Sequence, residues 1–100
     1  MDGWLMTEIE GRLLAAARTL AGLTVIELAA AAGVTTRTIG RIERASINAV
    51  APKLRHGHIA AGTLQRITKA LARHGVEVLP DGEGRGAGVR WVQPRLERDT

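Results

Sequence analysis

Apolar residues recur with helical spacing in four stretches of the chain. These stretches predict helices over about residues 8–21, 25–32, 36–44 and 64–74, because apolar positions three or four residues apart share one face of a helix. The apolar stripe of the first helix is expected to contain Ile9, Leu13, Ala16, Ala17 and Leu20. Together the four patterns indicate a mainly α fold.

A threonine stands at the expected start of every predicted helix. The N-cap candidates, in chain order, are Thr7, Thr24, Thr35 and Thr63. Glu10 and Glu27 follow the first two of these threonines by three residues, which is the spacing of a capping box. Glycine follows three of the helices, where a left-handed residue commonly ends a helix. These glycines are Gly22, Gly33 and Gly75.

After Gly75 the apolar pattern changes from helical spacing to alternation. Residues 76–79 and 89–92 are typical of two short strands, and the glycine-rich residues 80–88 connect them. The end of the chain is therefore predicted to form a β-hairpin.

One domain is expected from 100 residues, with a single modest core. We expect a helical part over residues 1–75, a hairpin of the same domain over residues 76–92, and a polar tail over residues 93–100. Residues 45–62 are predicted to form a basic loop with room for a helical turn, and Pro52 stops any helix that begins near Ile47.

The third predicted helix separates two kinds of side chain. A rotation of about 100° per residue places Ile39 and Ile42 on one side and Arg37, Arg41 and Arg44 on the other. When the isoleucines face the core, the arginines face solvent. Three guanidinium groups on one exposed face are suited to a polyanion, and duplex DNA is the partner that we expect.

The distribution of charge supports a nucleic-acid partner. The net charge is +4, and residues 12–74 contain ten Lys or Arg residues against two acidic residues, Glu27 and Glu43. A basic centre between more acidic ends is typical of a nucleic-acid-binding surface. A solvated basic surface has the same composition, so charge alone leaves both interpretations open.

Several other classes of protein are disfavoured by the sequence. The chain has no cysteine, which excludes disulfides and thiolate metal sites. No apolar run approaches the ~20 residues of a membrane span, and the first residues lack the pattern of a secretory signal. We therefore expect a cytoplasmic protein without a membrane partner.

No catalytic or cofactor-binding constellation is recognisable. His56 and His58 lack a neighbouring carboxylate, so no metal site is expected. Ser46 has no organised base beside it, which gives nucleophilic catalysis no support. The alternating glycines of residues 82–88 lead into a strand, whereas a dinucleotide-binding loop leads into a helix. We expect neither an enzyme nor a cofactor.

Residues 18–43 read RTLAGLTVIELAAAAGVTTRTIGRIE. This segment resembles the helix-turn-helix of the phage-repressor/Cro-type family of bacterial transcriptional regulators. The matching features are the Arg of the first helix, the Leu-Ala pair of the second, the Gly-Val-Thr turn and the Ile-x-x-Ile-Glu of the third. The resemblance is close over residues 12–44, and residues 63–92 are similar to a subgroup with a C-terminal hairpin. It implies a four-to-five-helix repressor-like domain.

The resemblance also implies which residues meet DNA. The helix at about 36–44 would be the recognition helix, which lies in the major groove. The positions that match those of the family are Thr36, Arg37, Gly40 and Arg41. The other candidate DNA-binding residues are Thr35, Arg44, Lys53 and Arg55. The last two, in the basic loop, either contact flanking phosphates or belong to a solvated loop. Family members often carry Gln where this chain has Val25, and valine cannot make the phosphate contact that this Gln makes.

Glu43 carries a carboxylate on the inner side of the third helix, where it needs a partner. In the family the corresponding Glu pairs with the Arg that matches Arg18. The resemblance therefore implies an Arg18–Glu43 ion pair with a structural role.

Two functions are compatible with these features. The first is a sequence-specific transcriptional regulator, a repressor that binds a pseudo-palindromic operator as a homodimer. Its hairpin would then be one route to dimerisation, with Trp91 either in the interface or packed on the helical core. The alternative is an antitoxin that binds a toxin protein as well as its own operator.

Overall fold

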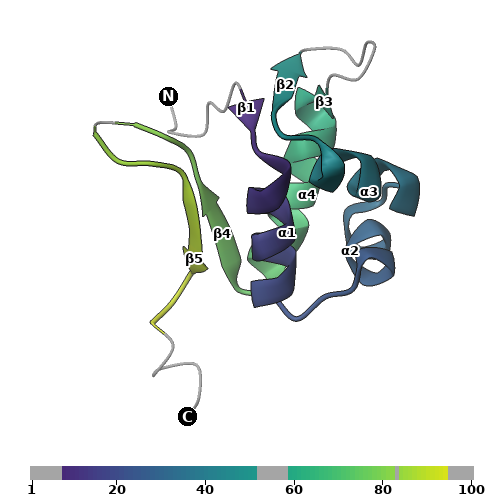
Figure 1. Cartoon of the computed structure of the whole chain (residues 1–100). Coiled ribbons are helices and arrows are strands. Elements are labelled where there is room, and N and C mark those ends of the chain that lie inside the picture. The colour runs from purple at the N-terminus through teal and green to yellow at the C-terminus, as the bar shows by residue number, and fades with distance from the viewer. Residues whose placement is uncertain (1–7, 52–58, 83, 95–100) are drawn as a thin grey trace.

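The computed structural model describes residues 8–51, 59–82 and 84–94, which contain four helices and five short strands (Figure 1). In chain order these are β1 (Glu8–Ile9), α1 (Gly11–Leu20), α2 (Val25–Ala32), α3 (Thr36–Arg44), β2 (Asn48–Ala51), β3 (Ile59–Ala60), α4 (Ala61–Arg73), β4 (Val76–Leu79) and β5 (Gly88–Trp91). The predicted mainly α fold with a C-terminal hairpin is confirmed. The predicted division into residues 1–75, 76–92 and 93–100 stays a prediction.

Helices α2 and α3 have the predicted bounds, because their termini are determined by neighbouring residues. The hydroxyl of Thr24 accepts a hydrogen bond from the amide of Glu27, and the Glu27 carboxylate accepts one from the amide of Thr24, which completes a capping box. Gly33 ends α2 with φ at 72°, a left-handed conformation that costs glycine little. Thr35 then caps α3 by accepting from the amide of Thr38 at 3.1 Å.

Helix α1 begins later than predicted. Thr7 lies outside the described residues, and Glu8 and Ile9 form β1 in place of a first helical turn. Glu10 is the N-cap, and its side chain makes no capping hydrogen bond. The capping box expected at the start of this helix is therefore wrong, because Glu8 and Ile9 find backbone partners in β2. The buried residues of α1 are Gly11, Leu14 and Ala17, whereas Ala16 is exposed.

Helix α4 begins two residues before the predicted N-cap. Its N-cap is Ala60, which provides no side-chain hydrogen bond, so the prediction that Thr63 caps this helix is wrong. The reason is that β3 runs directly into the helix, and its pairing with β2 fixes the extended residues Ile59 and Ala60. Leu64, Ile67 and Leu71 point into the core as expected.

A small three-stranded sheet replaces part of the predicted basic loop. Strand β2 lies in the middle, antiparallel to β1 and parallel to β3. Asn48 in β2 is 3% exposed, and its side-chain amide donates to the carbonyl oxygens of Ile9 at 3.2 Å and Ile42 at 3.0 Å. The sheet therefore ties the start of the described chain to the end of α3.

The C-terminal hairpin packs against the side of the helical core away from α3. Strands β4 and β5 pair antiparallel, with Val76 opposite Trp91 and Val78 opposite Val89. These four side chains face α1 and α4, and both valines of β4 are buried. Figure 1 shows α1 and α4 between the hairpin and the α2–α3 pair. The hairpin therefore leaves the outward face of α3 uncovered.

Within the described residues, no single helix has the length and hydropathy of a membrane span. Helices α1 and α2 reach the length and hydropathy of a span only when they are taken together, and the chain bends by 93° between them.

Candidate nucleic-acid interface

Helix α3 presents a basic face to solvent and an aliphatic face to the core. The side chains of Ile39 and Ile42 are fully buried, while Arg37, Arg41 and Arg44 are exposed. Among the described residues, none of these three arginines forms an ion pair. Their positive charge is therefore not neutralised by a described side chain, and it is available to an anion in solution.

The beginning of α3 is held by the turn that follows α2. The amide of Val34 donates to the carbonyl oxygen of Ala29 at 3.0 Å, which brings the chain back over the end of α2. The hydroxyl groups of Thr35 and Thr38 lie 3.0 Å apart in a hydrogen bond. Thr35 is thus engaged in capping, whereas Thr36 is exposed in the first turn of α3, where a DNA-reading residue is expected.

The end of α3 is held by the ion pair that was expected from the sequence. Arg18 donates from Nε to Oε2 of Glu43 at 2.7 Å and from Nη2 to Oε1 at 3.0 Å. Its Nη1 donates to the carbonyl oxygen of Leu23 at 3.0 Å. The side chains are 20% and 12% exposed respectively. The hydrogen bond to Glu43 raises the pKa of Arg18, so the guanidinium stays charged, and α1 is bonded to α3 at two points.

Two residues that the sequence interpretation missed also position α3. The amide of Gly11 donates to the carbonyl oxygen of Ala45 at 3.0 Å. A Cβ atom at Gly11 would lie 2.5 Å from the carbonyl oxygen of Ile42 and closer still to those of Glu43 and Ala45. A glycine inside a helical pattern is a signal of close backbone approach, and that signal was available at Gly11. Asn48, which bonds to the Ile42 carbonyl oxygen, carried no comparable signal.

Gly40 lies on the face of α3 between the core and solvent, and it is partly buried. A Cβ atom there would meet one nearby group, Nη1 of Arg44 at 3.0 Å. Because that atom ends a flexible side chain, the fold itself does not require glycine at this position. The missing side chain lowers the surface of α3 along the edge of the basic face.

Arg66 is an exposed arginine that lies near the predicted DNA-binding residues of α3. Arg66, from α4, lines a hollow together with Arg41 and with the residues that begin α3. The apolar spacing of this helix predicted only its buried face, and Arg66 was not among the predicted DNA-binding residues. Lys53 and Arg55, which were predicted to contact DNA phosphates, lie outside the described residues, as do His56 and His58. No group of three potential metal ligands occurs in the part of the chain that the structure describes.

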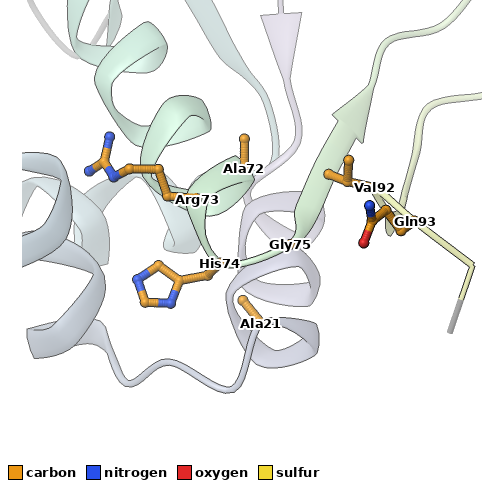
Figure 2. Close-up of a pocket in the computed structure, with 7 residues that line it drawn as sticks. All are labelled: Ala21, Ala72, Arg73, His74, Gly75, Val92 and Gln93. Atoms are coloured by element: carbon orange, nitrogen blue, oxygen red, sulfur yellow. The ribbon is translucent and has the colours of Figure 1, made fainter. Parts of the chain in front are cut away.

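A second hollow, of about 550 Å³, lies where the ends of α1 and α4 meet the base of the hairpin (Figure 2). Figure 2 shows His74 and Val92 on opposite sides of it. Its lining residues are Ala21, Ala72, Arg73, His74, Gly75, Val92 and Gln93. The described residues of this lining contain no carboxylate, and Arg73 donates to the carbonyl oxygen of Ala31 at 2.7 Å.

Comparison with protein families matches residues 14–53 to the family described as Helix-turn-helix. The matched range begins in α1, contains all of α2 and α3, and extends just beyond β2. No curated protein matches the chain.

Proposed function

We propose that the protein is a repressor that inserts α3 into the major groove of a specific operator. The match of residues 14–53 to the helix-turn-helix family of Cro/CI-type repressors and related transcriptional regulators supports this proposal. The family match over these residues supports a DNA-binding regulator. The choice of groove, operator binding and repression belong to the proposal.

The basic face of α3 carries this proposal. Arg37 and Arg41 lie one helical turn apart on that face, with exposed guanidinium groups. A guanidinium group donates two parallel hydrogen bonds to O6 and N7 of guanine, which the major groove presents. The buried Ile39 and Ile42 fix the rotation of the helix, so these arginines are held outward when DNA approaches.

The remaining positions of α3 are assigned by their place along the helix. Thr36, in the first turn, contacts a phosphate or a thymine methyl group. Gly40 allows the middle of the helix to approach the floor of the groove. Arg44, in the last turn, contacts the phosphate backbone and adds affinity without sequence information.

A homodimer that pairs the β5 strands of two copies fits this architecture. Among the described strands, β5 pairs with β4 alone, so no other described strand occupies its second edge. An open edge is a template for another strand. Because α1 and α4 separate the hairpin from α3, dimerisation there leaves both recognition helices free (Figure 1). Two copies would then read half-sites about one DNA turn, ~34 Å, apart.

Selection of bound duplexes from a random pool at ~150 mM salt tests this function. We expect a palindromic consensus with a guanine in each half-site, and a sedimentation experiment that shows a dimer. A pool that yields no consensus would contradict sequence-specific binding, and a monomer at all concentrations would contradict the dimer.

The antitoxin alternative makes the same prediction about an operator and adds a protein partner. Co-purification with the product of an adjacent gene would favour that alternative, and rescue of growth from that product would establish it.

A protein that binds DNA works in the compartment that contains the DNA. For a bacterial regulator this compartment is the cytoplasm.

A further inference from the structure

Arg73, the last residue of α4, is hydrogen-bonded to the end of α2. Its Nη2 donates to the carbonyl oxygen of Ala31 at 2.7 Å. Figure 2 shows the side chain of Arg73 extended away from Val92 and Gln93, which follow β5. Arg73 forms no ion pair with another described residue, so the Ala31 carbonyl group is the partner that holds its guanidinium group in place.

The carbonyl group of Ala31 lies where a helix needs an outside donor. The last four carbonyl groups of a helix have no partner within that helix. The amides of Gly33 and Val34 bond to two of these groups in α2, whereas no described backbone amide donates to Ala31. The last turn of α2 also contains no basic residue. Arg73 therefore provides both the hydrogen bond and the positive charge that favour the end of this helix.

This bond joins two turns of the chain that lead to different parts of the domain. Ala31 lies just before Gly33, where the chain turns from α2 toward α3. Arg73 lies just before Gly75, where the chain turns from α4 into β4. Helix α4 packs against α2, and α2 packs against α3. The bond is thus placed to fix the direction of α3 relative to the hairpin.

We propose that Arg73 is a positioning residue for DNA recognition, which holds the turn between α2 and α3 at a fixed place relative to α4 and the hairpin. The inference rests on the proposed function, in which two copies dimerise through their hairpins and read two half-sites. In such a dimer the separation of the two α3 helices depends on how rigidly each α3 is joined to its hairpin. Arg73 thereby determines how strictly the dimer requires one half-site spacing.

Amide hydrogen exchange of the free protein tests whether Arg73 holds the turn. Arg73→Met removes the donors and the charge but keeps a long side chain, whereas Arg73→Lys keeps a charged donor. We expect the amides of Gly33 and Val34 to exchange about fivefold faster in Arg73→Met, which is the effect of one lost hydrogen bond of ordinary strength. Arg73→Lys should keep the wild-type rates. Unchanged rates in Arg73→Met would overturn the proposal.

Lys69→Met is the matched control for both measurements. Lys69 is exposed on the same helix, and it lines a hollow beside β4 that does not include the end of α2. The control loses the same positive charge as Arg73→Met but leaves the bond to Ala31 in place. Its exchange rates should therefore equal those of the wild type.

The spacing preference of the operator tests the role in recognition. Affinity is measured for the selected operator and for a duplex with an additional base pair between the half-sites. We expect the ratio of the two affinities to fall about fivefold in Arg73→Met and to keep its wild-type value in Arg73→Lys and Lys69→Met. An unchanged ratio together with faster exchange would make Arg73 a structural residue only and overturn the proposal. If no duplex is selected, the proposed function fails and the role in spacing fails with it, whereas the exchange rates still decide whether Arg73 holds the turn.

Discussion

Arg18 and Glu43, 25 residues apart in the chain, meet in a two-point hydrogen-bonded ion pair that joins the last turn of α1 to the last turn of α3. The pair lies at the inner side of α3, opposite the face that is proposed to contact DNA. It therefore links the stability of the fold to the orientation of the basic face.

Replacement of Glu43 by Ala should destabilise the domain by about 2 kcal/mol, because Arg18 then keeps a mostly buried charge with one carbonyl partner. This corresponds to a fall in melting temperature of roughly 10 °C. Glu10→Ala serves as the control, since the Glu10–Arg12 pair is long, at 3.7 Å, and largely exposed. The control should lose less than about 1 kcal/mol. Equal melting temperatures for the two variants would show that the Arg18–Glu43 pair adds no stability.

Replacement of Gly11 by Ala should destabilise the domain by about 1–3 kcal/mol or more, because the added methyl group meets three backbone carbonyl oxygens that cannot move independently. Gly62→Ala is the contrasting variant, since the space around Gly62 is open. It should gain up to about 1 kcal/mol from its higher helix propensity. Thermal unfolding of both variants measures the difference, and a stabilised Gly11→Ala would mean that α1 and α3 are not in close contact.

Replacement of Gly40 by Ala should have opposite effects on folding and on DNA binding. The helix gains up to about 1 kcal/mol, because the new methyl group meets only the flexible end of Arg44. Binding to the selected operator should weaken, because the methyl group occupies the space into which DNA comes. Paired measurements of melting temperature and operator affinity check this, and an unchanged affinity would show that glycine here has no role in binding.

Replacement of Arg37 by Ala should relax specificity at one base pair of each half-site and cost about 1–3 kcal/mol on the selected operator. Arg44→Ala should instead weaken binding to selected and random duplexes by similar factors, because its expected partner is a phosphate. Competition binding against single-base variants of the operator distinguishes the two patterns. Similar losses on all duplexes for Arg37→Ala would exclude a base contact by this residue.

The parts of the fold that the sequence predicted well are those whose causes are local. Thr24 and Glu27 cap α2 within one turn, and Gly33 ends it, so both boundaries could be read from adjacent residues. The start of α1 was misplaced because Ile9 is paired with Asn48, which lies 39 residues further along the chain. Strands of two and four residues are too short to show a recognisable alternation of apolar and polar residues, so the β1–β2–β3 sheet was not predicted.

In the candidate site, too, the features with local causes were predicted and those that depend on distant residues were not. The two faces of α3 followed from helical geometry, because Ile39 and Ile42 alone decide which side is buried. The partner of Glu43 came from the resemblance to a family, since no local rule connects it to Arg18. Arg66 was missed because its neighbour Arg41 belongs to another helix, and their approach depends on where α4 begins.

Helix α3 is anchored by its inner side chains and by bonds at its two ends, and none of these contacts uses Arg37 or Arg41. Its outward positions can therefore be exchanged as a set while the scaffold keeps its melting temperature. A library randomised at positions 36, 37 and 41 would sample new operator preferences on one unchanged support, so this small domain is a suitable starting point for engineered regulators.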